Sequence, residues 1–364
     1  MAGASYDALV VGCGPVGALL AARLGAAGWS VLVVERSPEV FPLPRAVAAD
    51  SEVRELLERT LPGVTDGFLR DPGVRFLDAG RSEIGRLQLP LSLYGQPVVE
   101  RRLREHLASL DSVELRLGAE VGGFSQDDDG VTADVDGEPV RASWLVGCDG
   151  ASSSVRRRIG VPLLGRELPH RWLVCDVEGA PLTDRTSVTF TCDPARPQVD
   201  MPVPGGHRWE WLVPDGPLPA AAPLLALDAP DADLRVVREV EYRFAARRAA
   251  QWRVGRVLLA GDAAHTMPPF AGLGLGAGLR DAWALGALLP RGETAVDRYQ
   301  GLRVPHLRRA TAVSRFVGAI VQTRSPAAAG VRDALLRRAF AAPGLGPWLR
   351  RGGPRPDVSG VLDL

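Results

Sequence analysis

The sequence GRVLLAGDAAHTMPPFAGLGLGAGLRDA, residues 255–282, combines a strand, a carboxylate, a turn and a helix start. The apolar residues 257–260 predict a buried strand, which runs directly into Asp262. A proline-containing turn and a glycine-rich loop follow, and the loop leads into a helix. Bare N–H groups at a helix N-terminus favour an anion or an electron-rich ring edge. Taken alone, the stretch predicts a binding loop for a ligand that it does not identify.

A second signal lies near the N-terminus, where residues 6–35 predict a strand, a helix and another strand. The first strand runs into GCGPVG, residues 12–17, and the second ends at Glu35. In a GxGxxG turn the first glycine makes the tight turn, the second admits a pyrophosphate and the third lets helix and strand approach. An acid placed like Glu35 can accept a hydrogen bond from a ribose hydroxyl. We therefore expect a dinucleotide site, although this motif does not distinguish NAD from FAD.

A third segment, SWLVGCDGASSSVR at residues 143–156, repeats this logic. A buried strand ends at Asp149, and a serine-rich loop precedes a basic helix start. Between residues 161 and 252 alternating segments predict an antiparallel sheet, and the chain after residue 282 is predicted to be helical. The pattern as a whole indicates an α/β protein (α+β overall) with a Rossmann-type domain.

Composition excludes several classes of protein. The 364 residues suffice for two domains, and the formal net charge of zero predicts no nucleic-acid partner. The four cysteines and five histidines show no metal-ligand spacing, so we expect no metal site and a reducing, cytoplasmic location. The apolar run at residues 8–22 is short and interrupted by glycine and proline, so no membrane partner is expected. All 43 basic residues are arginine.

The three motifs, in this order, resemble the group A FAD-dependent monooxygenases, which share the p-hydroxybenzoate hydroxylase fold. Within this family, the sequence is most similar to the branch of phenol and 3-(3-hydroxyphenyl)propionate hydroxylases. This likeness rests on PLPRAV at residues 42–47, RWE at 208–210 and GDAAHTMPPF at 261–270. It covers residues 1 to about 320.

The resemblance implies a Rossmann-type FAD-binding domain formed by residues 1–71, 97–160 and 253–325. An interleaved antiparallel-sheet domain for the substrate would comprise residues 72–96 and 161–252, and residues 326–364 would form a short helical tail. Residues implied to hold FAD are Gly12, Gly14, Pro15, Val16, Gly17, Glu35, Arg36, Arg45, Gln96, Asp149, Asp262, Pro269, Gly272, Gly274, Leu275 and Gly276. Candidate substrate contacts are Met201, Trp209, Trp211 and Phe270. Aromatic residues of such a sheet more often form its core, which is the alternative role for them. Arg45 and Pro269 are the catalytic candidates, whereas His265 is expected to be structural.

The implied activity is that NAD(P)H reduces FAD, O2 adds to give a flavin C4a-hydroperoxide, and oxygen is delivered to a phenolic or polycyclic aromatic compound. The partners would be that small aromatic substrate and O2, and the protein would be a monomer or homodimer. Epoxidation or dehydrogenation stays open, as does a non-catalytic flavin-binding role. Halogenation is suggested by residues 209–214, which nearly spell WxWxIP, but the lysine that such enzymes require is absent.

The glycine-rich loop departs from the family pattern, which is closer to GQGxN. Leu273 and Gly276 stand where that pattern has glutamine and asparagine. The departure predicts weaker FAD binding, and restoring both side chains is expected to tighten it.

Overall fold

The computed structural model describes residues 5–43, 45–179, 185–230, 232–351 and 360–364. The strands of its first sheet are β1 (Ser5–Val11), β2 (Val31–Glu35), β8 (Val113–Leu117), β9 (Val121–Gln126), β10 (Val131–Val135), β11 (Glu138–Gly147), β17 (Arg253–Val254) and β18 (Val257–Leu259). The order is β17-β18-β11-β1-β2-β8, with β10 attached to β11 and β9 to β10. Strands β18, β11, β1, β2 and β8 are parallel. Their carboxyl ends therefore meet at one edge of the sheet, where ligands of such folds bind.

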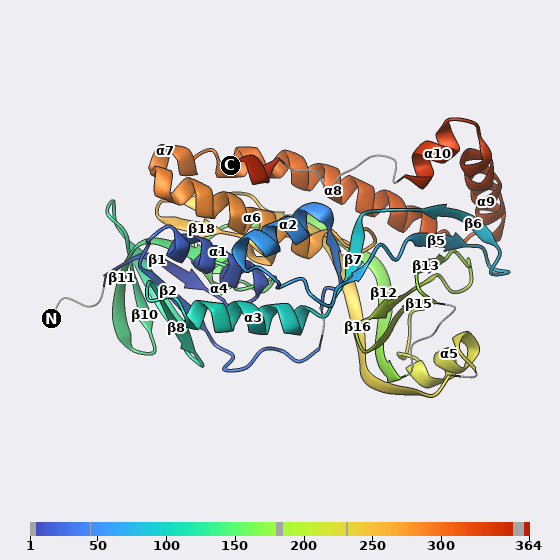
Figure 1. Ribbon diagram of the computed structural model, residues 1–364, viewed down its shortest axis with the longest axis horizontal. Helices are drawn as coiled ribbons and strands as arrows, with labels where there is room; N and C mark the ends of the chain where they lie inside the picture. Colours follow the sequence, from blue (N-terminus) through green and yellow to red (C-terminus); the bar gives the residue numbers. More distant parts are fainter. Residues whose placement is uncertain (1–4, 44, 180–184, 231, 352–359) are drawn as a thin grey trace.

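The helices around this sheet are α1 (Pro15–Ala26), α2 (Ser51–Thr60), α3 (Gln96–Ala108), α4 (Ser154–Arg158) and α6 (Gly274–Leu288), with 3-10 turns η1 (Gly261–Ala263) and η2 (Leu289–Arg291). Helix α1 packs against both α3 and α6 (Figure 1). Most of its side chains are small or aliphatic and buried, because neighbours cover it on several sides. This packing places the N-termini of α1 and α6 near the same edge of the sheet.

The second sheet contains β5 (Val74–Leu77), β6 (Glu83–Leu87), β12 (Leu163–Gly179), β13 (Val188–Thr191), β14 (Gln198–Val203), β15 (Gly206–Val213), β16 (Leu234–Ala249) and β19 (His265–Thr266). Its order is β19-β16-β12-β15-β14-β13-β5-β6. Neighbours are antiparallel except for β5 and β13, which pair in parallel. A short sheet of β3 (Ala48–Asp50), β7 (Leu91–Leu93) and β4 (Leu69–Arg70) is separate from both. Helix α5 (Ala221–Asp228) lies beside the second sheet (Figure 1).

The C-terminal part is helical, with α7 (Glu293–Val296), α8 (Tyr299–Val321), α9 (Pro326–Ala341), α10 (Leu345–Arg350) and the 3-10 turn η3 (Val361–Asp363). Helix α8 runs along the molecule from the first sheet toward the second, and α9 packs against β6 (Figure 1). The predicted fold class, a Rossmann-type domain with an antiparallel sheet and C-terminal helices, is confirmed. The predicted limits of the individual domains stay predictions. None of the helices in the described ranges is long and apolar enough to cross a membrane.

Candidate functional site

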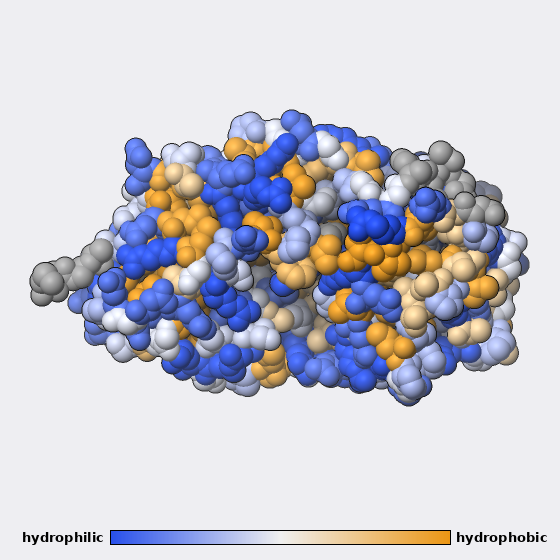
Figure 2. All heavy atoms as spheres, turned by 90° about the horizontal axis from the view of Figure 1, so that it is seen from below, coloured by the Kyte–Doolittle hydropathy of each residue, from blue (hydrophilic) through white to orange (hydrophobic). Residues whose placement is uncertain are grey.

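A cavity of about 1060 Å³ lies between the edge of the first sheet and one face of the second. Seen from below, the surface is hollowed near its middle, between the halves of the molecule built on these two sheets (Figure 2). The segments that follow β1, β2, β11 and β18 line one end of the cavity. The other end is lined by strands of the second sheet and by helices α8 and α9. One continuous space therefore joins the expected nucleotide edge to the expected substrate sheet.

Three glycines shape the turn after β1. At two of them the backbone is in close contact with other backbone atoms, and at the third it is open to the cavity. Gly12 has φ +100°, and a Cβ atom there would lie 2.6 Å from the carbonyl oxygen of Cys148. A Cβ atom at Gly17 would lie 2.0 Å from the carbonyl oxygen of Gly12, so Gly17 closes the turn and does not line the cavity. Gly14 lines the cavity, and apart from its chain neighbours no described residue has an atom within 4 Å of its Cβ position, which leaves room for a phosphate to approach the backbone. Pro15 and Val16 also line the cavity.

Glu35 lies at the end of β2, where its position is fixed by backbone donors. Its Oε2 accepts a hydrogen bond from Cys13 N at 2.7 Å, and its Oε1 accepts one from Ser37 N at 2.9 Å. The neighbouring Arg36 lines the same wall. This arrangement holds a carboxylate beside the glycine turn, where the sequence predicts the adenosine ribose.

Sequence reasoning missed Arg104, which reaches the same region from helix α3. Its Nε donates to the carbonyl oxygen of Cys13 at 3.2 Å, and its Nη2 donates to Glu100 at 2.9 Å. Its Nη1 is buried at the cavity without a hydrogen-bond partner among the described residues. Gln96, Glu100 and Arg104 all line the cavity, and their i, i+4, i+8 spacing on one helix is the signal that could have found this group.

Asp149 follows β11 and caps helix α4. Its Oδ2 accepts hydrogen bonds from Ser154 N at 2.7 Å and Val155 N at 3.1 Å. Its Oδ1 is buried without a hydrogen-bond partner within the described part of the chain, and the residue lines the cavity. Asp149 therefore holds the start of α4 through Oδ2, and its Oδ1 remains available to accept a hydrogen bond from a ligand.

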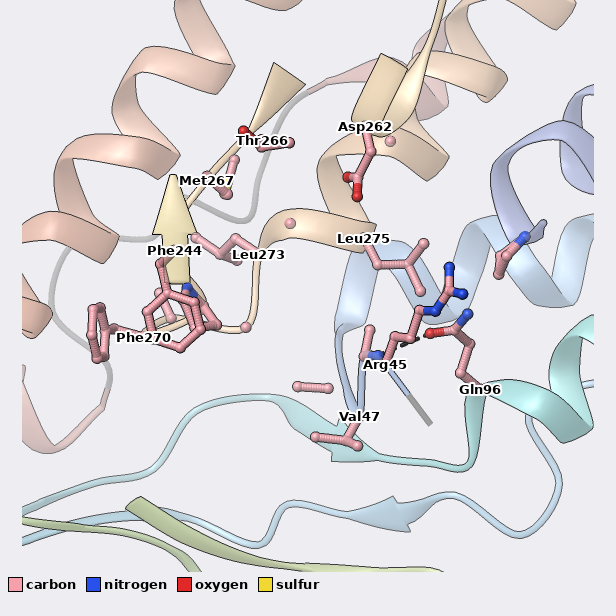
Figure 3. A pocket seen from close by; sticks show the side chains of 18 of the residues that line it. Arg45, Val47, Gln96, Phe244, Asp262, Thr266, Met267, Phe270, Leu273 and Leu275 are labelled. Carbon is pink, nitrogen blue, oxygen red and sulfur yellow. Dashed lines mark hydrogen bonds between the residues drawn. The ribbon is translucent and has the colours of Figure 1, made fainter. Parts of the chain in front are cut away.

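Asp262, which follows β18, points into the cavity together with Leu275, Arg45 and Gln96 (Figure 3). Burial raises the pKa of Asp262, although His265 and Arg45 lower it in part. Gln96 Oε1 accepts a hydrogen bond from Ala46 N at 2.9 Å, so it also shapes the loop that carries Arg45.

The turn behind Asp262 is held by Asp281 of helix α6. Asp281 Oδ2 accepts a hydrogen bond from Gly261 N at 3.1 Å and lies 2.6 Å from His265 Nε2. Its Oδ1 accepts one from Arg303 Nε at 2.8 Å. His265 is 1% exposed and does not line the cavity, so it holds the turn as expected rather than facing a ligand.

The glycine-rich loop lines the cavity through Pro269, Gly272, Gly274 and Leu275. Gly272 has φ +66°, and a Cβ atom there would lie 2.9 Å from that of Ala48. Gly276 was predicted to contact FAD, but it does not line the cavity. A Cβ atom at Gly276 would lie 2.9 Å from both Arg280 Nη1 and Val53 Cγ2. The close packing of α6 against α2 therefore leaves little room for an asparagine side chain at this position, and a contact of Gly276 with FAD stays a prediction.

The four candidate substrate contacts separate into two pairs. Met201 and Phe270 line the cavity. Trp209 and Trp211 do not: both are fully buried on the opposite face of the sheet, with Leu173 and Leu225. Side chains alternate between the two faces of a strand, so Arg208 and Glu210 of β15 face the cavity and the tryptophans form a core beneath it. This placement favours the core role over a substrate contact for both tryptophans.

Comparison with known proteins places this geometry in a family. Residues 5–213 and 220–314 match the family model described as "FAD binding domain". The chain belongs to this FAD-binding family. The resemblance inferred from the three motifs is confirmed, and FAD is the cofactor it implies. The open backbone at Gly14, the unpaired Asp149 Oδ1 and the unpaired Arg104 Nη1, all at one cavity, fit such a group.

The similar proteins carry different names. A 3-(3-hydroxy-phenyl)propionate/3-hydroxycinnamic acid hydroxylase of Comamonas testosteroni is 36% identical over 93% of this chain, which spans 62% of that protein. The crystal structure of the p-nitrophenol 4-monooxygenase PnpA from Pseudomonas putida DLL-E4 is 28% identical with a TM-score of 0.85, covering 92% of this chain and 94% of that one. The Diels-Alderase PyrE3 of pyrroindomycin biosynthesis is 31% identical with a TM-score of 0.77, covering 97% and 81%.

Proposed function

We propose that this chain is a flavoprotein monooxygenase that uses NAD(P)H and O2 to hydroxylate a phenolic or polycyclic aromatic compound. The observation that carries the proposal is the single cavity that joins the nucleotide edge of the first sheet to an apolar face of the second. The names of the hydroxylase relatives support the same reaction class. We also infer a cytoplasmic protein that acts as a monomer or homodimer; the four unpaired cysteine thiols support the reducing compartment.

Bound FAD would supply the redox chemistry that activates O2 with electrons from NAD(P)H. The residues of the chain would bind and orient it. The backbone at Gly14 and the guanidinium of Arg104 would bind the pyrophosphate, and Glu35 would bind the ribose; the open backbone at Gly14 and the unpaired Nη1 of Arg104 support these roles. Asp262 would accept a hydrogen bond from a hydroxyl of the cofactor, and the N-terminus of α6 would provide N–H groups and positive potential at the cavity.

The second sheet would cover the substrate and exclude water. Val174, Phe190, Val199, Met201 and Phe244 provide an apolar wall of the cavity. Trp172, Phe244 and Phe270 pack edge-on and tilted against one another, with ring centroids 5.4–5.8 Å apart. This cluster gives the aromatic end of the cavity a defined shape.

The reaction is tested on purified protein loaded with FAD, supplied with NAD(P)H and candidate phenols under 18O2. We expect substrate-dependent NAD(P)H oxidation and a product that carries the label. The Diels-Alderase relative makes a non-oxidative reaction the second candidate. Product formation without label and without NAD(P)H consumption would favour that candidate and reject hydroxylation.

The placement of FAD is tested by replacing Asp262. Asp262→Ala is expected to raise the Kd for FAD roughly tenfold or more, because a hydrogen bond to a charged group is lost. Asp111→Ala, at an exposed position, is the matched control. Equal FAD affinity in the wild type and Asp262→Ala, measured by flavin fluorescence titration, would show that this carboxylate does not face the cofactor.

A further inference from the structure

The cavity face of the second sheet carries a charged group beside its apolar wall. On β15 the side chains of Arg208 and Glu210 face the cavity, and on β16 those of Arg238 and Tyr242 do so. Asp176 of β12 lies opposite Arg208 in the sheet. Deep inside a protein such charges are costly unless each one is paired and hydrogen-bonded. The pairing of each member therefore shows which of them are structural.

The arginines of this group are held by Asp176. Arg208 Nε and Nη2 donate to Asp176 Oδ1 and Oδ2 at 2.6 and 3.0 Å, and Arg208 Nη1 donates to the carbonyl oxygen of Arg45 at 3.2 Å. Arg238 Nη2 donates to the hydroxyl of Tyr242 at 2.7 Å, and its Nη1 lies 3.6 Å from Asp176 Oδ2. Asp176 thus lies between two guanidinium groups, and both arginines are anchored in the wall.

Glu210 differs from the rest of the group. Its nearest charged partner is Arg208 Nη1, which lies 3.9 Å from Glu210 Oε1, beyond hydrogen-bond distance. No described residue donates a hydrogen bond to its carboxyl group, although the residue is only 9% exposed and lines the cavity. Its partners in the sheet are Val174 and Val199, which offer no polar side chain. A purely structural partner of Arg208 would be expected to bond it directly, as Asp176 does.

The electrostatics around Glu210 fit an acceptor kept for a ligand. Burial raises the pKa of Glu210; Arg208 on its own strand and Arg238 on β16 lower it in part, while Asp176 on β12 raises it. The residue opposite on β14 is Val199, which is uncharged. With both acids ionised, the two arginines and two acids form a neutral group. The carboxylate can therefore accept a hydrogen bond while the balance of charge in the wall is kept.

Resting on the proposed function, we propose that Glu210 is the substrate-binding acceptor of this cavity and takes the hydrogen bond of the phenolic hydroxyl. The ring of the substrate would lie against the neighbouring apolar wall of Val174, Val199 and Met201. The cavity then selects uncharged aromatic compounds that carry a hydroxyl group. An anionic group placed at the same point would meet the carboxylate and be rejected.

The same contact moves a proton during the reaction. In the resting complex the phenol keeps its proton and donates a hydrogen bond to Glu210. As oxygen is delivered to the ring, the O–H bond of the substrate breaks, the proton passes to a carboxyl oxygen of Glu210, and the electron pair stays on the substrate oxygen. This makes the ring more electron-rich, and the proton returns to the oxygen of the product. A carboxyl group whose pKa is raised by burial is a better proton acceptor than one at its ordinary value.

The test compares p-nitrophenol with nitrobenzene as probes of the FAD-loaded protein, without NAD(P)H. We expect the wild type to bind p-nitrophenol more tightly than nitrobenzene, and Glu210→Gln to lose roughly tenfold in affinity for p-nitrophenol only. Glu178→Gln, an exposed position on β12, is the matched control. Equal FAD content in the three proteins shows that each one is folded.

A spectroscopic signature separates a direct contact from a structural effect. At a pH equal to the solution pKa of p-nitrophenol, the wild-type carboxylate should favour the neutral probe, so binding reduces the nitrophenolate absorbance. In Glu210→Gln the amide can donate to the phenolate, and the absorbance should be kept. Equal spectra and affinities in the two proteins, or no binding to the wild type, would overturn the proposal. Probe binding through Glu210 without 18O transfer would instead reject only the proposed hydroxylation.

Discussion

Asp281 in helix α6 and Glu210 in strand β15 are both buried carboxyl groups, but among the described residues only Asp281 has hydrogen-bond donors. Asp281 is contacted by Gly261 N, His265 Nε2 and Arg303 Nε at 2.6–3.1 Å. Burial raises the pKa of Asp281, but His265 and Arg303 outweigh this effect and hold the pKa below its ordinary value. For Glu210 burial prevails, and its pKa is raised.

The difference separates an acid that holds the fold from an acid that awaits a ligand. A carboxylate that is already bonded on both oxygens has little left to offer a substrate, and its removal leaves charged partners buried. A carboxylate that faces a cavity without hydrogen-bond donors lowers the free energy of unfolding. Binding of a ligand that donates a hydrogen bond offsets this loss. The following changes test this distinction.

The largest effect is expected for Asp281→Ala. Its removal leaves Arg303 and His265 buried without their acid, and should lower the free energy of unfolding by about 3–5 kcal/mol. Urea unfolding followed by tryptophan fluorescence measures this loss, with Asp111→Ala as the exposed control. Because the folded pKa of Asp281 is depressed, its contribution should be present above the unfolded pKa of about 3.9 and be lost as the pH falls through the folded value. A loss below 1 kcal/mol near neutral pH would contradict the structural role of Asp281.

An intermediate effect is expected for Gly276→Asn, next to the ion pairs of Arg280 with Asp50 and Glu52. The new side chain would displace Arg280 or Val53, at a cost of about 1–3 kcal/mol in the free energy of unfolding. It should not tighten FAD binding, because Gly276 does not face the cavity. Leu273→Gln is the informative control, since Leu273 does line the cavity. Tighter FAD binding by the Gly276 variant, in a flavin titration, would show that the loop rearranges to expose this position.

The smallest effect on stability is expected for Glu210→Gln. The folded pKa of Glu210 is raised, so its contribution to stability is fully present below the unfolded pKa of about 4.3 and is lost as the pH rises through the folded value. The wild type should therefore lose stability relative to the variant between acidic and neutral pH. Melting temperatures of both proteins across this range measure the difference. If Glu210→Gln were less stable than the wild type at neutral pH, Glu210 would stabilise the fold as Asp281 does.

Much of the nucleotide end could be predicted from the sequence, because the motif residues follow parallel strands. Gly14, Glu35, Asp149 and Asp262 come from distant segments, yet all line one cavity. Their roles toward FAD stay predictions, although strand ends of a parallel sheet necessarily meet at one edge.

The substrate end could not be predicted in the same way. Alternation shows that Trp209 and Trp211 share a face of β15, but it does not show which face meets the cavity. Large aromatic residues suggested binding, and they form a core instead. Glu210 carried no signal in the sequence, since its distinctive property is that neither neighbouring strand, β12 or β14, donates a hydrogen bond to its carboxyl group. Arg104 could have been found from its spacing to Gln96 along one helix.

The parallel pairing of β5 with β13 has a consequence for protein engineering. Residues 74–77 and 188–191 belong to one sheet, although the whole of α3 and four strands of the first sheet, β8 to β11, separate them in sequence. In a chimera that took only residues 161–252 from a relative, strand β13 of the relative would pair with β5 of this chain. Recombination that aims to change substrate preference should therefore move both segments together, with the side chains of α9 that cover β6.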